Sequence, residues 1–438
     1  MLSPLSADTP FTPACHTGIV IEQYENPAGR GRNRSPRAWR SRLADTHLSR
    51  RTMSSQTPVP AGFVGVAGNI GIKDPNDDFF TVVSRTPAVV SAVFTRSRFA
   101  GPSVRLSRDA AANGNARGVV VIARNANVAT GRIGARDARE VQERVARAAG
   151  IAPEELLIAS TGVIGRPYPM ERVRSYLDGL PTEFPPADLD RSAAAMMTTD
   201  THPKIASAKV GGATLTGMAK GVGMIEPDMA TMLAWFFTDA ELEQPVLDTV
   251  FRRVVDRTFN ALSIDTDTST SDSAAIFANG AAGEVDVVEF EEALREVALK
   301  LVRMIASDGE GAGKLIEVRI TGARDDAQAK RVGKAVVNSP LVKTAVHGAD
   351  PNWGRVAMAV GKCSDETDIL PEKVRIVFGD VETFPTEATE QTLERAAHHM
   401  KGDEVLISVD LGIADGDFTV YGCDLTEGYI RINADYTT

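Results

Sequence analysis

One glycine-rich segment of the chain places a small residue directly before a threonine. The segment Lys220-Gly-Val-Gly-Met-Ile-Glu-Pro-Asp-Met-Ala-Thr231 ends in the pair Ala230–Thr231. A self-cleaving N-terminal-nucleophile enzyme needs such a pair, because the threonine hydroxyl can attack the preceding carbonyl and form an ester that water then opens. The freed α-amine has a reference pKa of about 8, so it can act as a base near neutral pH. By its spacing alone, the segment fits a buried structural threonine as well as a nucleophile that carries its own base.

Two other polar segments have residue types suited to binding charge. Ser160-Thr-Gly-Val-Ile-Gly165 follows a predicted strand, where a turn of small residues can aim backbone N–H groups at a developing oxyanion. Asp350-Pro-Asn-Trp-Gly-Arg355 reads as an exposed turn whose arginine suits a carboxylate. Taken alone, each segment is equally compatible with an ordinary turn.

Several segments resemble familiar motifs but lack residues that those motifs require. Asp308-Gly-Glu-Gly-Ala-Gly-Lys314 lacks the first glycine and the final Ser or Thr of a phosphate-binding loop, and it follows a predicted helix. The stretch that begins at Asp265 resembles a calcium loop, but it has Thr270 where that loop needs glycine and Ile276 where it needs glutamate. The six histidines are scattered, and the three cysteines form no CxxC pair. We therefore expect neither a metal nor a cofactor.

Hydrophobic periodicity supplies the elements that must position these segments. Runs of β-branched and aromatic residues alternate along the chain with helical spacing, which predicts an α/β or α+β class. The strands are expected at 79–83, 89–95, 118–123, 156–159, 316–321, 374–378 and 405–411, and the helices at 137–149, 247–257 and 289–306.

Composition excludes several classes of protein. The net charge of −10 argues against a protein that coats nucleic acid or adheres to anionic membranes. No apolar run reaches transmembrane length, so no membrane partner is expected. The scarcity of cysteine is typical of a reducing compartment and predicts a cytoplasmic protein.

Residues 1–52 differ from the rest of the chain. They hold eight Arg and no Lys, against two Asp and two Glu, a net charge of 8 − 4 = +4. No continuous apolar stretch marks a secretory signal. We interpret this segment as a disordered arginine-rich extension or the product of an early start codon, and we expect the working protein to begin near Met53.

Several segments together resemble the glutamate N-acetyltransferase family, whose members are also called ornithine acetyltransferases. The resemblance covers roughly residues 60–438 and includes five motifs in the same order, at 160–165, 197–201, 220–233, 267–272 and 350–355. Phe94–Ser103 and Glu226–Thr231 are most similar to the members encoded in clavulanic acid gene clusters. The family more often has a neutral residue in place of Glu226 and Asn or Ser in place of Asp228.

The resemblance implies an αββα sandwich of the N-terminal-nucleophile-like kind found in DmpA and ornithine acetyltransferases. It implies cleavage between Ala230 and Thr231, so that residues 53–230 and 231–438 become an α chain and a β chain of one catalytic unit. The two chains would assemble as a heterotetramer or a larger oligomer. Thr231 would take acetyl from N2-acetylornithine and pass it to glutamate in a ping-pong reaction through an acetyl ester.

The resemblance also assigns site residues. Thr161 and Gly162 match the oxyanion pair, and the substrate-binding positions are Thr198, Lys220, Thr231, Glu310, Asn433 and Thr438. A lysine offers a cation to an α-carboxylate, and a glutamate offers an anion to an ammonium. The last two positions can reach the site only if the tail folds back. Without the resemblance, Lys220 and Glu310 read as surface charges.

Three alternatives stay open at this stage. A bifunctional enzyme would also use acetyl-CoA, although no pantetheine or adenine site is evident in the sequence. An aminopeptidase or amidase of related fold would lose its acyl group to water. A non-catalytic binding protein would keep its chain intact. The sequence does not decide between arginine and clavulanate biosynthesis.

Overall fold

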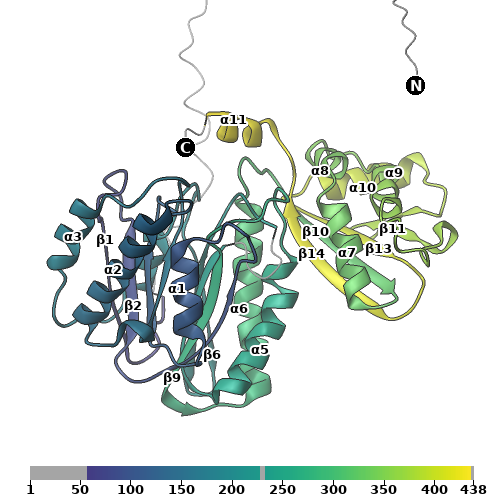
Figure 1. The fold of residues 1–438 in the computed structure, drawn as a ribbon. Helices are drawn as coiled ribbons and strands as arrows, with labels where there is room; N and C mark the ends of the chain where they lie inside the picture. Colours follow the sequence, from purple (N-terminus) through teal and green to yellow (C-terminus); the bar gives the residue numbers. More distant parts are fainter. Residues whose placement is uncertain (1–56, 227–231, 436–438) are drawn as a thin grey trace, which may run out of the picture. The chain divides into compact units, whose positions relative to one another are not determined.

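The computed structural model describes residues 57–226 and 232–435, all within one compact unit, Gln56–Thr438. Ala230, Thr231 and Thr438 lie outside the described residues. Figure 1 shows three sheets and the helices that cover them. Within the described ranges, none of the helices is both long and apolar enough to cross a membrane.

The first sheet has four strands in the order β1-β2-β4-β5. These are β1 (Phe63–Gly68), β2 (Phe79–Ser84), β4 (Gly118–Ile122) and β5 (Leu156–Ser160). Only the β4–β5 pair is parallel. The strands β2, β4 and β5 are buried along their whole length, which explains their near-continuous apolar sequence.

The second sheet has five strands in the order β3-β9-β8-β7-β6. These are β3 (Val89–Phe94), β9 (Ser273–Glu284), β8 (Leu233–Glu241), β7 (Ala213–Lys220) and β6 (Lys204–Val210). The β8–β9 pair is parallel and the others are antiparallel.

The first two sheets pack face to face through an aromatic-rich core. Phe63 of β1 meets Phe237 of β8 edge-on, with ring centroids 5.2 Å apart. Phe237 also stacks on Phe277 of β9 at 5.6 Å. Phe80 and Trp235 belong to the same buried cluster. Large rings thus fill the space between the sheets and fix their separation.

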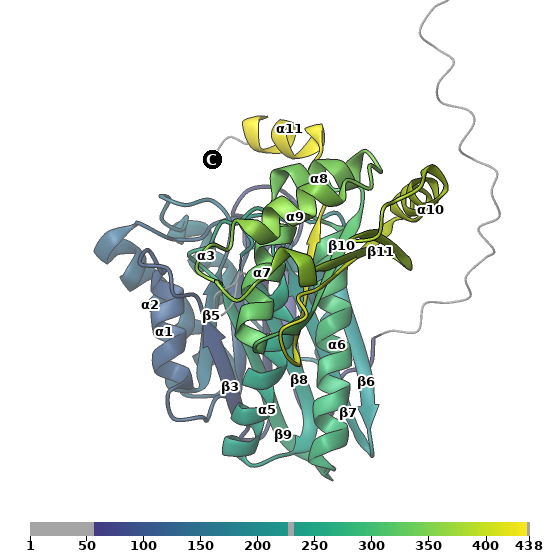
Figure 2. The same ribbon diagram turned by 90° about the vertical axis from the view of Figure 1, so that its right-hand side faces the viewer.

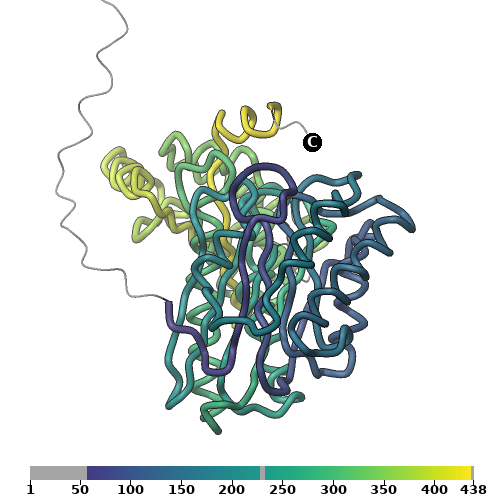
Figure 3. Tube along the Cα trace, turned by 90° about the vertical axis from the view of Figure 1, so that its left-hand side faces the viewer, coloured from purple at the N-terminus to yellow at the C-terminus, as the bar shows by residue number. Residues whose placement is uncertain are grey.

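Helices cover the outer faces of both sheets. On the first sheet these are α2 (Gly131–Ala149) and α3 (Met170–Asp178), and on the second α5 (Gln244–Arg257) and α6 (Val287–Ser307). The expected αββα sandwich is therefore confirmed, and Figures 2 and 3 show it from its two sides.

Two short helices lie at the edges of the sandwich. The helix α1 (Pro102–Ala111) contacts the edge strands β3 and β5, and α4 (Leu189–Ala195) contacts β1, β2, β6 and β7. Both add small buried residues to the core between the sheets, including Ala110 and Ala193.

A third sheet, in the order β12-β11-β13-β10-β14, forms a lobe that shares a buried cluster with α5 and α6. Its helix α11 (Glu427–Asp435) follows the last strand. The other elements of the lobe are β10 (Leu315–Ala323), α7 (Asp326–Val337), α8 (Pro340–His347), α9 (Trp353–Gly361), β11 (Arg375–Phe378), β12 (Val381–Phe384), α10 (Glu390–Met400), β13 (Glu404–Asp410) and β14 (Gly416–Cys423).

All seven predicted strands and all three predicted helices are present, with shifted ends. The helix α2 begins at Gly131 rather than Asp137. Its first turn was missed because it holds two glycines and an exposed Ile133, and so shows no buried apolar face. The segment expected as an exposed turn at 350–355 instead starts α9, with the Asn352 side chain as its N-cap. Arg355 Nη1 donates to the Leu341 carbonyl at 2.8 Å, so this arginine links α9 to α8.

Lys314, in the rejected phosphate motif, has a structural role. Its Nζ donates to the carbonyls of Met400 at 2.6 Å and Val346 at 2.9 Å, near the carboxyl ends of α10 and α8. A cation at these positions satisfies carbonyls that have no partner within their helices.

Candidate active site

Strand register gathers the candidate residues at one end of the sandwich. In the second sheet Lys220 pairs with Leu233, Leu233 with Ser273, and Ser273 with Phe94. In the first sheet Ser160 pairs with Ile122 at the ends of β5 and β4. The loops that leave these strands therefore meet, although they are distant in sequence.

Thr161 and Gly162 form a constrained turn after β5. The Thr161 N–H donates to the Ile122 carbonyl at 3.1 Å. Gly162 has φ +127°, and a Cβ at this position would lie 2.2 Å from the carbonyl carbon of Arg124. Only glycine fits this backbone, because the loop after β4 passes directly against it.

Lys220 connects this turn to the loop before β6. Its Nζ donates to Thr161 Oγ1 at 3.2 Å and to Thr198 Oγ1 at 3.0 Å. Desolvation lowers the pKa of Lys220, and the negative charges of Asp200 and Asp272 oppose that shift. The side chain thus presents a cation to two hydroxyls at the junction of the two sheets.

Glu310 lies on the other side of the same strand ends. Its carboxylate accepts from Thr199 Oγ1 at 3.0 Å and from Asn433 Nδ2 at 2.9 Å. A Cβ on Gly223 would meet Glu310 Oε2 at 2.5 Å, so the carboxylate packs directly over the glycine-rich segment. The contact from Asn433 confirms that α11 folds back onto this region.

Beneath these residues lies a buried ion cluster that the sequence did not reveal. Lys204 is fully buried, and its Nζ donates to Asp200 Oδ1 at 2.7 Å and to Asp308 Oδ2 at 2.6 Å. Asp200 also accepts from the N–H groups of Thr198 at 3.1 Å and Gly221 at 2.8 Å. Burial alone would raise the pKa of Asp200, but the nearby lysines and hydrogen bonds outweigh it and lower the pKa.

Asp272 is a second buried carboxyl at the site. It is 3% exposed, and its Oδ2 has no hydrogen-bond partner in the described structure. It lines a small cavity together with Thr161, Lys220 and Ser271. Burial raises the pKa of Asp272 well above its usual value, against hydrogen bonding from Ser269 and the charge of Lys220. This carboxyl is therefore protonated more readily than an exposed aspartate.

The chain is anchored on both sides of residues 227–231. Asp265 accepts from the N–H groups of Met224 at 2.6 Å and Ile225 at 2.8 Å. The Glu226 carboxylate accepts from Ser263 Oγ at 3.0 Å and Asn338 Nδ2 at 2.7 Å. On the far side, the Met232 carbonyl accepts from the N–H of Ser273. Glu226 thus has a structural anchoring role.

The structure brings together most of the residues predicted from the sequence. Thr161, Thr198 and Lys220 are in direct contact, and Gly162 adjoins them. Glu310 and Asn433 form a second contact, joined to the first through the neighbouring residues Thr198 and Thr199. Among residues 57–226 and 232–435, no group of three His, Cys, Asp or Glu could hold a metal ion.

The sequence analysis assigned no role to Asp200, Lys204, Asp272 or Asp308. Asp200 and Asp272 stand within the motifs 197–201 and 267–272, and Asp308 begins the rejected phosphate motif, but their burial could not be predicted. Lys204 and Asp308 are 104 residues apart, and a lone lysine ordinarily indicates exposure. The available signal was the three threonines that flank Asp200 between Met197 and Lys204.

The site places a cation and an anion beside a constrained turn. Lys220 can bind a carboxylate, and Glu310 can bind an ammonium. Glu310 contributes to the electrostatic field at Lys220, so the two opposite charges lie in one neighbourhood. This arrangement is complementary to a small molecule that carries both charges.

Comparison with known proteins identifies the family of the chain. The family model for the ArgJ family matches residues 65–438. The chain is 65% identical over 393 residues to "Glutamate N-acetyltransferase Oat2" of Streptomyces clavuligerus, covering 88% of this chain and all of that one. It is 54% identical over 382 residues to "Arginine biosynthesis bifunctional protein ArgJ" of Rhodococcoides fascians, covering 86% and 94%.

A solved structure of the same family is also similar. The crystal structure of arginine biosynthesis bifunctional protein ArgJ from Bacillus halodurans is 40% identical, with a TM-score of 0.42, and covers 45% of this chain and 96% of that chain. The family match and the two curated relatives identify an acyltransferase, as predicted. The chain belongs to the ArgJ family.

The buried ion cluster can be tested by removing its cation. Lys204→Met leaves the buried carboxylates of Asp200 and Asp308 facing each other without the cation between them, so we expect the free energy of unfolding to fall by about 3–5 kcal/mol. Chemical denaturation measures this loss. Lys209→Met, at an exposed position of the same strand, is the matched control and should change stability by less than about 1 kcal/mol. Equal stability of the two variants would contradict the assigned role.

The raised pKa of Asp272 predicts a pH dependence of stability. Below its unfolded-state pKa, near 3.8, the carboxyl is protonated in both states. As pH rises above that value the unfolded state ionises first, so wild-type stability falls relative to Asp272→Asn until the folded pKa is passed. Unfolding free energies of both proteins, measured as a function of pH, should therefore diverge. Asp403→Asn, at an exposed position, should run parallel to wild type, and parallel curves for Asp272→Asn would refute the prediction.

Proposed function

We propose that this enzyme is a glutamate N-acetyltransferase that moves acetyl from N2-acetyl-L-ornithine to L-glutamate. The observation that carries the proposal is that Lys220, which is hydrogen-bonded to Thr161, lies near enough to Glu310 to feel its negative charge. The donor has an α-carboxylate and a side-chain ammonium, which complement these two charges. Membership of the ArgJ family and the similarity to a protein named glutamate N-acetyltransferase support glutamate as the acetyl acceptor.

The proposal includes self-cleavage between Ala230 and Thr231. The Thr231 hydroxyl attacks the Ala230 carbonyl carbon, the acyl group moves from nitrogen to oxygen, and water hydrolyses the ester. Residues 53–230 then end in a carboxylate, and residues 231–438 begin with a free threonine amine. The hydrogen bonds of Glu226 and Met232 fix the described residues on either side of this segment, which is consistent with the proposed cleavage.

Acetyl transfer then proceeds in two steps. The Thr231 amine accepts the hydroxyl proton while the oxygen attacks the acetyl carbonyl of the donor. Collapse of the tetrahedral intermediate breaks the amide bond, and the departing ornithine amine takes the proton. The glutamate amine next attacks the acetyl ester, which releases the Thr231 hydroxyl and N-acetylglutamate.

The remaining roles follow from charge and position. Thr161 and Gly162 stabilise the oxyanion of both intermediates. Lys220 and Thr198 bind the α-carboxylate shared by donor and acceptor. Glu310 binds the ornithine ammonium, assisted by Asn433 and by Thr438 at the end of the chain. In this proposal the two chains stay associated as one catalytic unit and assemble as a heterotetramer or larger oligomer.

The exchange itself provides the test. Ornithine release from N2-acetylornithine is measured with and without glutamate, alongside free acetate and N-acetylglutamate. Because glutamate clears the acetyl ester, we expect it to accelerate ornithine release and to yield one N-acetylglutamate per ornithine. Reciprocal rate plots at several glutamate concentrations should be parallel, as expected for a ping-pong reaction.

The contrasting result is equally specific. Ornithine and acetate released at a rate that glutamate does not change would indicate an amidase or aminopeptidase, whose acyl-enzyme is lost to water. That outcome would exclude glutamate as the acetyl acceptor. The assignment of Thr231 as the nucleophile would still stand.

A further inference from the structure

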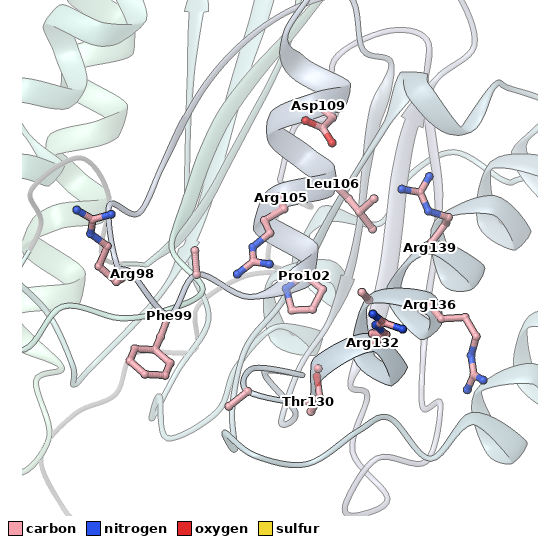
Figure 4. Close-up of a pocket in the computed structure, with 14 residues that line it drawn as sticks. Arg98, Phe99, Pro102, Arg105, Leu106, Asp109, Thr130, Arg132, Arg136 and Arg139 are labelled. Atoms are coloured by element: carbon pink, nitrogen blue, oxygen red, sulfur yellow. The ribbon is translucent and has the colours of Figure 1, made fainter.

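Two cavities of the structure differ in their relation to the candidate active site. One, of about 930 Å³, lies between α1 and α2, and its lining includes none of the residues placed in the site (Figure 4). The other, of about 550 Å³, is lined by Thr198 and Asp200 of the site together with Lys73, Asp74 and Arg124. We call it the Arg124 cavity. It adjoins the site through Thr198 and has a volume typical of small-molecule sites.

Arg124 belongs to the loop after β4 that packs against the turn of Thr161 and Gly162. The Val163 N–H donates to the Arg124 carbonyl at 3.4 Å, and the Ala126 N–H donates to the Val163 carbonyl at 3.0 Å. Arg124 has φ +70°, a region that residues other than glycine rarely occupy. Side chains held on such a backbone cluster at functional sites. The arginine side chain therefore starts from the wall of the candidate active site.

The Arg124 guanidinium has bonding capacity to spare. Its side chain is 12% exposed and forms an ion pair with Asp74. Its Nε is buried and has no hydrogen-bond partner among the described residues. The Asp74 carboxylate, which is 38% exposed, also accepts from the Asn76 N–H at 2.9 Å and from Asn76 Nδ2 at 3.0 Å. Asp74 can therefore release the arginine and keep other partners.

The other two acids of the lining are paired with cations. The Asp77 carboxylate accepts from Arg191 Nε at 2.6 Å, and the Asp200 carboxylate accepts from Lys204 Nζ at 2.7 Å. Because these negative charges are already compensated, a further carboxylate that enters the cavity meets the guanidinium of Arg124 without strong repulsion.

The loop that carries Asp74 is fixed by its own hydrogen bonds. The buried Asp78 carboxylate accepts from the N–H groups of Ile70 at 2.6 Å and Ile72 at 2.8 Å. Asn69 Nδ2 donates to the Asp74 carbonyl at 2.7 Å. This wall of the cavity is thus preorganised, which lowers the entropic cost of binding a ligand there.

The two substrates of the proposed reaction carry side chains of opposite charge. Acetylornithine ends in an ammonium, which Glu310 complements, whereas glutamate ends in a carboxylate, which Glu310 repels. Lys220 is already engaged by the α-carboxylate that donor and acceptor share. The acceptor therefore needs a second cation next to Thr198.

We propose that Arg124 is a specificity-determining residue that binds the side-chain carboxylate of the acceptor. The α-carboxylate of glutamate lies on Lys220 and Thr198, and its side chain enters the Arg124 cavity, where the guanidinium exchanges Asp74 for the substrate. This subsite rests on the proposed function and extends it, because it separates the acceptor side chain from the donor side chain.

Steady-state kinetics of Arg124→Met tests the subsite, since kcat/KM for each substrate of a ping-pong enzyme reports its own half-reaction. We expect kcat/KM for glutamate to fall about 10- to 100-fold, because charge-assisted bonds to a carboxylate are lost. The value for N2-acetylornithine should stay within about twofold. Arg124→Lys keeps the charge and should recover part of the loss. Arg395→Met, at an ion-paired arginine of α10, is the matched control and should behave like wild type.

Two further comparisons separate charge recognition from a structural role. Glutamine matches glutamate in shape but lacks the side-chain charge, so Arg124→Met should lose most of the wild-type preference for glutamate over glutamine. Asp74→Asn removes the competing carboxylate and should raise kcat/KM for glutamate about two- to fivefold, the range for a partly exposed ion pair. An unchanged or lowered value would contradict the exchange of partners.

Direct binding distinguishes failure of this proposal from failure of the proposed function. Isothermal titration calorimetry of glutamate against unacetylated wild type and Arg124→Met requires no acetyl exchange. Wild-type affinity in Arg124→Met would overturn the proposal, as would the absence of saturable glutamate binding to wild type at millimolar concentration. Equal kinetic losses with glutamate, glutamine and N2-acetylornithine would also overturn it. Ornithine release from wild type that glutamate does not accelerate would instead overturn the proposed function.

Discussion

The contact of Lys204 with Asp200 and Asp308 is the constraint on which the site depends most. It lies fully inside the protein, where a charge without a partner would be strongly unfavourable, so the three side chains must stay together. Asp200 holds the backbone of Thr198 and Gly221, and Asp308 holds Thr201. The loop before β6, the end of β7 and the end of α6 are thereby locked to one another.

Above this cluster, strand pairing sets which loops meet. The strand register brings the ends of four strands to one edge, at Phe94, Ser273, Leu233 and Lys220. Thr161, which follows the last strand of the other sheet, accepts a hydrogen bond from Lys220 there.

The sequence predicted the helices and strands whose positions depend on the local hydrophobic pattern. The apolar run at 118–123 and the periodic helix at 289–306 stand where expected, since burial alone determines them. The strand β9 was missed because its alanine- and glycine-rich sequence has low strand propensity, and its place is set by pairing with β3 and β8. The family resemblance assigned Lys220 and Glu310 to the site, where local pattern alone indicated surface charges. The burial of Lys204 and Asp272 depends on tertiary neighbours that no local pattern encodes.

The most direct test of the central claim, that Thr231 is a self-released nucleophile, is intact mass spectrometry. Wild type and Thr231→Ala are incubated with N2-acetylornithine in the absence of glutamate. We expect two wild-type fragments, the second beginning at Thr231 and heavier by one acetyl group, and a single uncut, unacetylated chain for the variant. A wild-type protein that remains one uncut chain would contradict the account, because Thr231 would then have no free amine.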